Sequence, residues 1–178
     1  ATIAPLSPDG APELSGVLSK SVEFVGSSDG MFVNQDRASI IKGRMASVDR
    51  VDEAVITASA AQKAGLHIGQ VLRMGYYTEA QVTLPAFGTP RVRPRLSVEI
   101  KLVGIVVLNR QVVQDDAGRT SGFMVLSPAL VRAASAISPG GHLDQAPGAP
   151  VLYGLQLDHG GRDVAAVEQA FVRAPRPG

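Results

Sequence analysis

The sequence predicts an α+β fold with a mixed or mainly antiparallel sheet and a few short helices. Three observations lead to this prediction. Residues 54–74 read as a strand, a short helix and a second strand. Residues 97–107 alternate apolar and polar side chains as a β-strand does. Residues 151–171 contain another strand followed by a helix. Two strand–helix units with mixed connections indicate the α+β class.

The N-terminal residues 1–20 are expected to be a linker, because Ala1 to Gly16 carry three prolines and little periodicity. A folded domain is expected over 21–174, with room for two lobes, and a second linker over 175–178. Ser21–Phe24 and Met31–Val33 are candidate strands. The Gly-Ser-Ser-Asp-Gly cluster between them favours a turn, so the pair is expected to form a hairpin.

The unit at residues 54–74 has clear start and stop signals. Ala54–Ile56 is short and β-branched, and Thr57 or Ser59 is expected to cap the helix Ala58–Ala64. Gly65 is expected to end that helix in the left-handed conformation, with Leu66 folding back as the apolar contact. Val71–Met74 then forms the second strand.

The second half of the chain opens with Tyr76–Pro94, where prolines and glycines break any long element. In Ser97–Val107 alternate residues face opposite sides up to residue 102, after which both faces are apolar, as in a strand entering the core. Ser127 is expected to cap a helix with Pro128 at its first position. Val151–Leu157 reads as a strand, and a helix is expected after Asp163.

The order of these segments resembles the extracytoplasmic domain of FtsX-like, or MacB-like, ABC-transporter permeases. Members of that family carry an apolar segment ending in Gly-Arg, then Asp-Glu before an apolar strand, an Ala-containing helix, Gly-Leu-x-x-Gly and a further strand. The segments that correspond here to the first four of these features are, in order, Ile40–Arg44, Asp52–Thr57, Ala58–Ala64 and Gly65–Gln70. Later segments also agree with the family in their order: Ser97–Val107, Val125–Pro128, Val151–Leu157 and the helix after Asp163. The resemblance covers about Ser21 to Ala174. Gln70 departs from the usual Asp, and the Arg/Pro-rich stretch Thr89–Arg95 is an insertion.

This resemblance implies a fold of the MacB-like periplasmic core type and a non-catalytic function without cofactors. The domain would lie on the extracytoplasmic face of a bacterial cell membrane, anchored by the rest of the permease. It would couple a cytoplasmic ABC ATPase to substrate export or to an extracytoplasmic partner protein. An inserted domain must return its chain to the bilayer, so Ser21 and Ala174 are expected at one end of the fold.

Composition excludes several function classes. Hydrophobic residues make up 45% of the chain and charged residues 19%, which indicates a folded domain rather than disorder. The net charge of +1 and the scarcity of aromatic residues argue against nucleic acid as a partner. Cysteine is absent, which excludes disulfides and thiolate metal sites. No run of about 18 apolar residues is present, so no membrane span is expected.

No motif predicts catalysis or metal binding. His67, His142 and His159 lack the spacing of a zinc site. A triad of Ser127, His142 and Asp144 lacks a nucleophile elbow, and a helix cap explains Ser127 better. The adjacent pairs Asp52-Glu53 and Asp115-Asp116 are expected to point to opposite faces or into solvent, and no calcium or phosphate loop is present.

One stretch is a candidate partner-binding site. Arg91, Arg93 and Arg95 alternate, which places them on one face of an extended segment, with Tyr76 and Tyr77 as candidate contact aromatics. The arginines form either a docking stripe for an anionic partner or lipid headgroup, or a charged, Pro-blunted sheet edge that prevents edge-to-edge pairing. A docking stripe is expected to lie away from the membrane-proximal base.

A second resemblance is local. Ala60–Leu72 is similar to the Ala-Gly-Leu-x-x-Gly stretch of PDZ domains, which bind C-terminal peptides by strand addition. No carboxylate-binding Gly-Leu-Gly loop precedes it. A PDZ-like peptide-binding module is therefore the alternative function.

Overall fold

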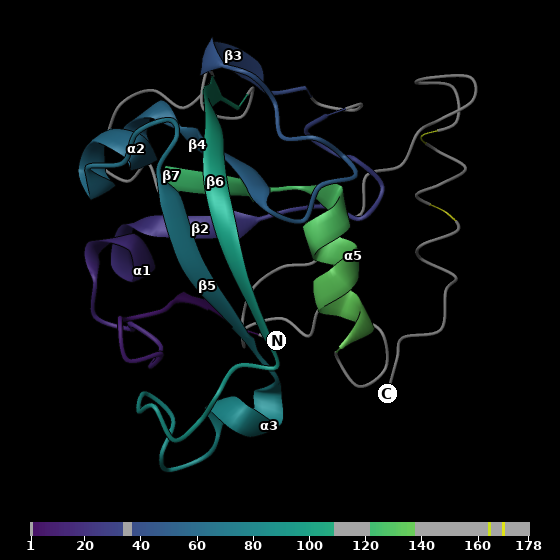
Figure 1. Ribbon diagram of the computed structural model, residues 1–178. Coiled ribbons are helices and arrows are strands. Elements are labelled where there is room, and N and C mark those ends of the chain that lie inside the picture. The colour runs from purple at the N-terminus through teal and green to yellow at the C-terminus, as the bar shows by residue number, and fades with distance from the viewer. Residues whose placement is uncertain (1, 34–36, 109–121, 138–163, 165–168, 170–178) are drawn as a thin grey trace.

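The computed structural model describes residues 2–33, 37–108, 122–137, 164 and 169. Within these ranges the chain forms an α+β fold, in which a mixed seven-stranded sheet makes a nearly closed barrel accompanied by a few short helices (Figure 1). The strands are β1 Thr2–Pro5, β2 Val22–Val25, β3 Ser39–Gly43, β4 Glu53–Thr57, β5 Val71–Tyr77, β6 Leu96–Val107 and β7 Gly122–Leu126. The helices are α1 Val17–Ser21, α2 Ala58–Ala64, α3 Glu79–Val82 and α5 Pro128–Ala136.

The strand order is β1-β5-β6-β4-β7-β2. The pairs β1–β5, β5–β6 and β4–β7 are antiparallel, whereas β6–β4 and β7–β2 are parallel. The expected α+β fold with a mixed or mainly antiparallel sheet is therefore confirmed, and the sheet is mixed. In Figure 1, β5 and β6 cross in front of β2 and β7, with α2 and α5 on opposite sides and α3 at the lower end.

The twelve-residue strand β6 organises the sheet. Its first half pairs with β5 and its second half with β3 on the same side, while β4 pairs along its other side. Ser97, Glu99 and Lys101 are exposed and Ile100 is buried, and every residue from 102 to 104 is buried. The expected change from alternating to fully apolar character is confirmed, because Leu102 and Val103 lie on opposite faces of β6 and each packs in a hydrophobic cluster.

The helix signals of the β4–α2–β5 unit act as expected, with one difference. Gly65 is left-handed at φ 65°, and the Leu66 amide donates to the Ala61 carbonyl at 2.9 Å, which ends α2. Thr57 occupies the N-cap position, but its hydroxyl oxygen accepts from the Phe123 amide at 3.0 Å and caps nothing in α2. That side chain joins β4 to β7 instead.

The expected cap of the later helix is confirmed. Ser127 accepts a hydrogen bond from the Leu130 amide at 3.2 Å, and Pro128 is the first residue of α5. The strand β7 that leads into it was not expected, although it lies in the interior of the sheet between β4 and β2.

The N-terminal part of the chain differs most from expectation. Thr2–Pro5, expected to belong to a linker, is the edge strand β1 and pairs with β5. Met31–Val33 forms no hairpin with β2. It turns instead, with Phe32 at φ 69°, because Ser27 and Asp29 side chains accept the Met31 amide. β2 pairs with β7 instead. The elements expected at 151–157 and after residue 163 lie outside the described residues, as does Ala174.

The main core lies between the sheet and the helices α2 and α5. Its completely buried members include Ile56, Met74, Ile100, Leu102 and Leu130. A separate small cluster at the lower end contains Ala4, Tyr77 and Val92. This small cluster joins β1 to the segment that precedes β6, and so positions the predicted arginine site.

Candidate functional site

The strongest electrostatic feature is centred on Glu53, at the start of β4. Its side chain is only 6% exposed, and both of its oxygens are occupied. The Nη1 and Nη2 atoms of Arg44 donate to Oε2 at 2.7 Å and to Oε1 at 2.6 Å. The Ser47 amide donates to Oε2 at 3.1 Å, and Arg50 Nε lies 3.1 Å from Oε1. The carboxylate therefore holds the loop 44–52, between β3 and β4, at three points.

Arg50 also joins the two adjacent carboxylates. Its Nε donates to Asp52 Oδ1 at 3.0 Å while lying near Glu53. Hydrogen bonding from Arg44 lowers the pKa of the Glu53 carboxyl to about 2, with burial acting in the opposite direction. A hydrogen bond from Arg50 likewise lowers the pKa of Asp52. Glu53 is thus ionised at neutral pH, serves as a structural anion and is a poor general base.

Other motif residues meet this same loop. A Cβ on Gly104 of β6 would collide with the Arg44 carbonyl oxygen, so only glycine permits this approach. At the N-terminus of α5, the hydroxyl of the cap residue Ser127 donates to the Arg50 carbonyl, and the Ala129 amide donates to the Val48 carbonyl at 3.1 Å. The loop 44–52 is therefore wedged between β6 and the start of α5.

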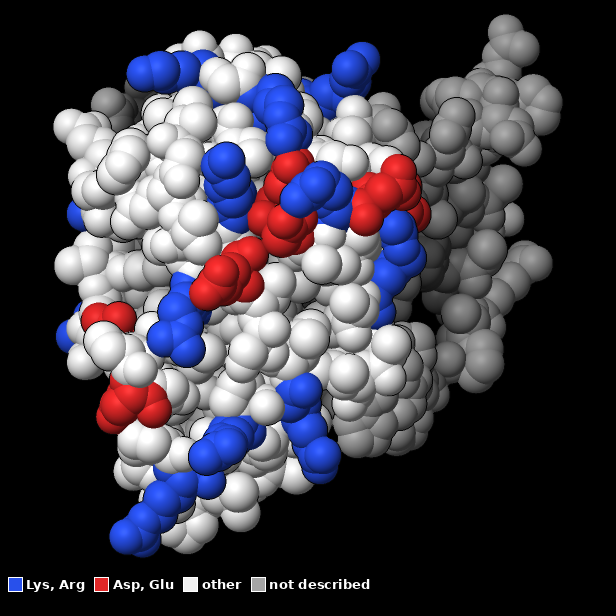
Figure 2. Space-filling model, in the orientation of Figure 1, with Lys and Arg blue, Asp and Glu red and all other residues white. Residues whose placement is uncertain are grey.

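The predicted arginine site lies at the other end of β6, between α3 and the start of that strand. Arg91, Arg93 and Arg95 are all exposed, and Val92 between them is 6% exposed. The segment is neither a strand nor a sheet edge, because the chain turns and bends over residues 89–95. Figure 2 shows blue side chains gathered over this lower end.

The backbone of the arginine segment is fastened to its neighbours. The Arg95 amide donates to the Tyr76 carbonyl at 2.8 Å, and Gln81 Nε2 donates to the Arg93 carbonyl at 2.7 Å. Gln81 also completes a capping box with Thr78 at the start of α3. Three exposed guanidinium groups are thus presented from a tethered loop.

Tyr76 and Tyr77 are not surface aromatics. They are 3% and 0% exposed at the end of β5, and the Tyr77 ring packs edge-on against Phe87 at a centroid distance of 5.2 Å. Burial raises the pKa of both phenols, and neither hydroxyl has a hydrogen-bond partner among the described residues. The expectation that these tyrosines are contact aromatics beside the arginines is therefore wrong, because both tyrosine side chains fill the interior.

The remaining candidates are placed as follows. His67 is exposed in the turn before β5. Ser127 is 1% exposed and serves as the cap of α5. Within the described ranges no three His, Cys, Asp or Glu side chains gather where they could hold a metal ion. His142, Asp144, His159, Asp115 and Asp116 lie outside these ranges.

Two features of these sites were not predicted from the sequence. The Arg44–Glu53 pair joins residues nine positions apart across a loop, and no local periodicity indicates it. The α3 cap does have a local signal, the Thr78-x-x-Gln81 capping-box pattern.

The comparisons with known proteins add no relationship: no protein-family model, no curated protein and no solved structure matches this chain. Across the residues that the structure describes, every helix is too short or too polar to cross a membrane.

Proposed function

We propose that this chain is the extracytoplasmic domain of an FtsX-like ABC-transporter permease, with a fold of the MacB-like periplasmic core type. It is non-catalytic and binds no cofactor. It couples a cytoplasmic ATPase to the export of a substrate or to an extracytoplasmic partner protein, while the rest of the permease anchors it in a cell membrane.

One observation carries this proposal: motif segments that are distant in the sequence meet at the loop 44–52. Arg44 of the Gly-Arg segment binds Glu53 of the Asp-Glu segment. Gly104, in the Ser97–Val107 segment, admits the Arg44 backbone, and Ser127 of the Val125–Pro128 segment donates to the Arg50 carbonyl. Residues that resemble one family's pattern are expected to depend on one another physically, and these do.

This arrangement suits mechanical coupling. Three contacts join β3, β4, β6 and α5 at one place. They are the fully hydrogen-bonded carboxylate of Glu53, the close approach of Gly104 to the Arg44 backbone, and the hydrogen bond from the cap residue Ser127. Packed interiors transmit displacement because they deform little. A movement applied to one of these elements is therefore passed to the others.

The PDZ-like alternative is less favoured. It uses the surface beside a helix for a bound peptide. Ala60 of α2 packs so closely on β7 that a Cβ on Gly122 would collide with it, and Ala61 is also buried. The chain itself fills that face of α2.

The experiment is cysteine labelling in the full-length gene product. The chain has no cysteine, so the exposed Gln62 changed to Cys supplies a single reporter, in a protein cleared of cysteines elsewhere. A membrane-impermeant maleimide is expected to label it in intact cells with the outer membrane permeabilised. An ABC ATPase is expected to co-purify from detergent extracts.

The matched control is Ala60→Cys, which is buried and is expected to react only after denaturation. Labelling of Gln62→Cys only after cell lysis would place the domain in the cytoplasm and contradict the proposal. Purification without any ATPase, from a full-length protein lacking membrane spans, would also contradict it.

A further inference from the structure

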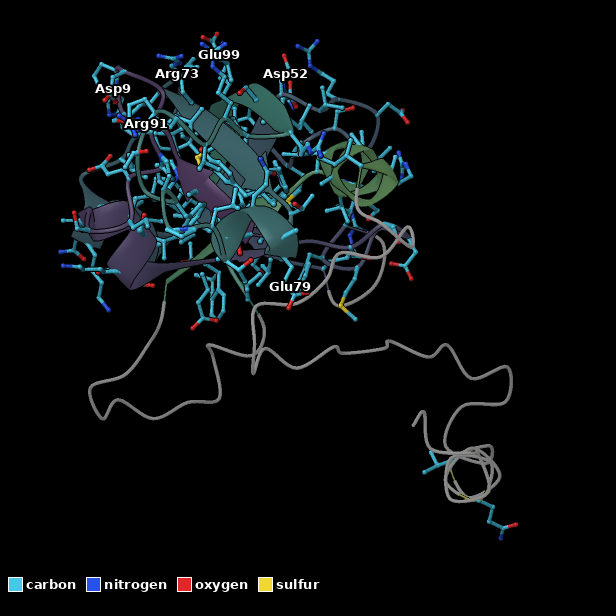
Figure 3. The ribbon with its side chains drawn as sticks, turned by 90° about the horizontal axis from the view of Figure 1, so that it is seen from below. Asp9, Asp52, Arg73, Glu79, Arg91 and Glu99 are labelled. Carbon is cyan, nitrogen blue, oxygen red and sulfur yellow. The ribbon has the colours of Figure 1, made fainter. Side chains whose placement is uncertain are left out.

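The lower end of the molecule combines unpaired positive charge with exposed apolar side chains. Among the described residues no carboxylate lies within ion-pair distance of Arg91, Arg93 or Arg95. Asp9, on the same side as Arg91 in Figure 3, accepts hydrogen bonds from Ser7 and the Ala11 amide instead. Glu79 points to the opposite side. The three guanidinium charges therefore remain available to an external anion.

Two exposed leucines lie on, or close to, the loop that carries these charges. Leu84, after α3, and Leu14 are each 47% exposed. Leu14 Cδ1 lies close to Gly88, since a Cβ built there would be 3.7 Å away from it. Basic residues beside exposed leucines are typical of surfaces that rest in the headgroup region of a membrane, where arginine meets phosphate and leucine meets acyl chains.

This end also lies beside the first strand. Thr2 is the register partner of Tyr77, and Arg95 bonds the carbonyl of Tyr76. A docking stripe was expected away from the membrane-proximal base. That base was expected at Ser21 and Ala174, and Ala174 lies outside the described residues, so the expectation stays untested. The arginines lie next to the start of β1, where under the proposed function the chain would arrive from a membrane helix.

We propose that Arg91, Arg93, Arg95, Leu84 and Leu14 form a membrane-contact surface that binds anionic phospholipid headgroups. This inference rests on the proposed function for its biological setting. The capping box of α3 and the buried Val92 hold the surface in place, so binding requires little ordering of the backbone. The contact would set the orientation of the domain above the bilayer.

The test is sedimentation of the purified chain with vesicles of phosphatidylcholine alone or of phosphatidylcholine and phosphatidylglycerol in equal parts. We expect binding to the anionic vesicles only, and its loss at high salt. The triple variant Arg91→Gln, Arg93→Gln, Arg95→Gln is expected to reduce partitioning about 100-fold, because each basic residue at such a surface contributes about 1 kcal/mol. Leu84→Ser is expected to weaken binding with all charges retained.

A matched control removes three exposed charges elsewhere, by Arg37→Gln, Lys42→Gln and Lys101→Gln. Lys42 pairs near the far end of β6, roughly 30 Å from the surface at about 3.3 Å per residue. This control is expected to keep most of the binding, and changing the three surface arginines to Lys is expected to restore it. Thermal melts of each variant show whether it is folded.

Absence of binding to anionic vesicles, or an equal loss in the surface and control triples, overturns the proposed surface. Neither result affects the cysteine-labelling test of the permease proposal. Conversely, cytoplasmic labelling together with arginine-dependent vesicle binding would reject the permease and leave the lipid-binding surface standing.

Discussion

Arg44 and Glu53 form a bidentate ion pair, in which each terminal nitrogen of the guanidinium donates a hydrogen bond to a different carboxylate oxygen at 2.6–2.7 Å. The two members differ in exposure: the Glu53 side chain is 6% exposed and that of Arg44 57%. The arginine therefore closes over a buried anion from the solvent side. Such geometry is stronger than a single-point surface pair, because both partners are held in one orientation.

Replacing Glu53 by Gln is expected to lower the free energy of unfolding by about 1–3 kcal/mol. The amide keeps the shape but loses the charge that Arg44, Arg50 and the Ser47 amide share, and the solvent exposure of Arg44 limits the cost. Urea unfolding measures the change. Glu99→Gln is the control, expected within about 0.5 kcal/mol, since this exposed residue is a register partner of Arg73 on the open side of the sheet (Figure 3). Equal losses in the two variants would contradict a special role for Glu53.

Acid is expected to remove the same contribution. The folded pKa of Glu53 is about 2, whereas an unfolded glutamate titrates near 4.3. The unfolded chain thus takes up the proton first, so the stabilisation is complete above about pH 4.3 and is lost as the pH falls toward 2. Urea midpoints of wild type and Glu53→Gln, compared from pH 6 to pH 2, are expected to converge in acid. A difference that stays constant with pH would show that ionisation of Glu53 is irrelevant.

Gly104→Ala tests the close approach of β6 to the loop 44–52. The added methyl group would collide with the Arg44 carbonyl oxygen, which is backbone and cannot rotate away. We expect a loss of about 3 kcal/mol. Lys101→Ala, an exposed position on the same strand, is the control and is expected to be nearly neutral. Tolerance of Gly104→Ala would mean that the loop is free to retreat.

Gly65 tests backbone conformation without crowding. A Cβ there would meet nothing within 4 Å, yet φ is 65°. Gly65→Val is therefore expected to cost about 1–2 kcal/mol through strain alone, and Gly65→Asn markedly less, because asparagine tolerates the left-handed region. Thermal melts distinguish the two. Identical melting of both variants would argue against a left-handed end of α2.

Tyr76→Phe is expected to be neutral or to stabilise by up to about 1 kcal/mol. The Tyr76 hydroxyl is buried with no partner among the described residues, so its removal relieves a desolvation penalty while the ring stays in place. Urea unfolding measures the sign. A loss above about 1 kcal/mol would reveal a partner for the hydroxyl.

Local signals in the sequence predicted local structure. Gly65 ends α2 and Ser127 with Pro128 starts α5, because a left-handed residue or a side-chain cap acts within four residues of itself. The alternation in β6 also follows from neighbouring residues. Together with the strand–helix unit expected over residues 151–171, these features indicated an α+β fold with a mixed or mainly antiparallel sheet.

The candidate site was predicted in part. Exposure of Arg91, Arg93 and Arg95 followed from their charge and spacing, but the burial of Tyr76 and Tyr77 did not follow from their types. Tyrosine is as compatible with an interface as with a core. Only the packing of β5 against β1 and Phe87 decides between them.

The sequence alone was sufficient wherever a residue's role depends on its own dihedral angles or on a partner one turn away. Tertiary structure decided the rest: that Thr2–Pro5 joins the sheet, that β7 lies inside it, and that Gly104 makes room for Arg44 beside Glu53. Each of these depends on segments brought together by burial of apolar surface, which has no direction along the chain. Contacts between such distant segments produce no periodic pattern in the sequence, so they are identified only from the arrangement of the strands in the fold.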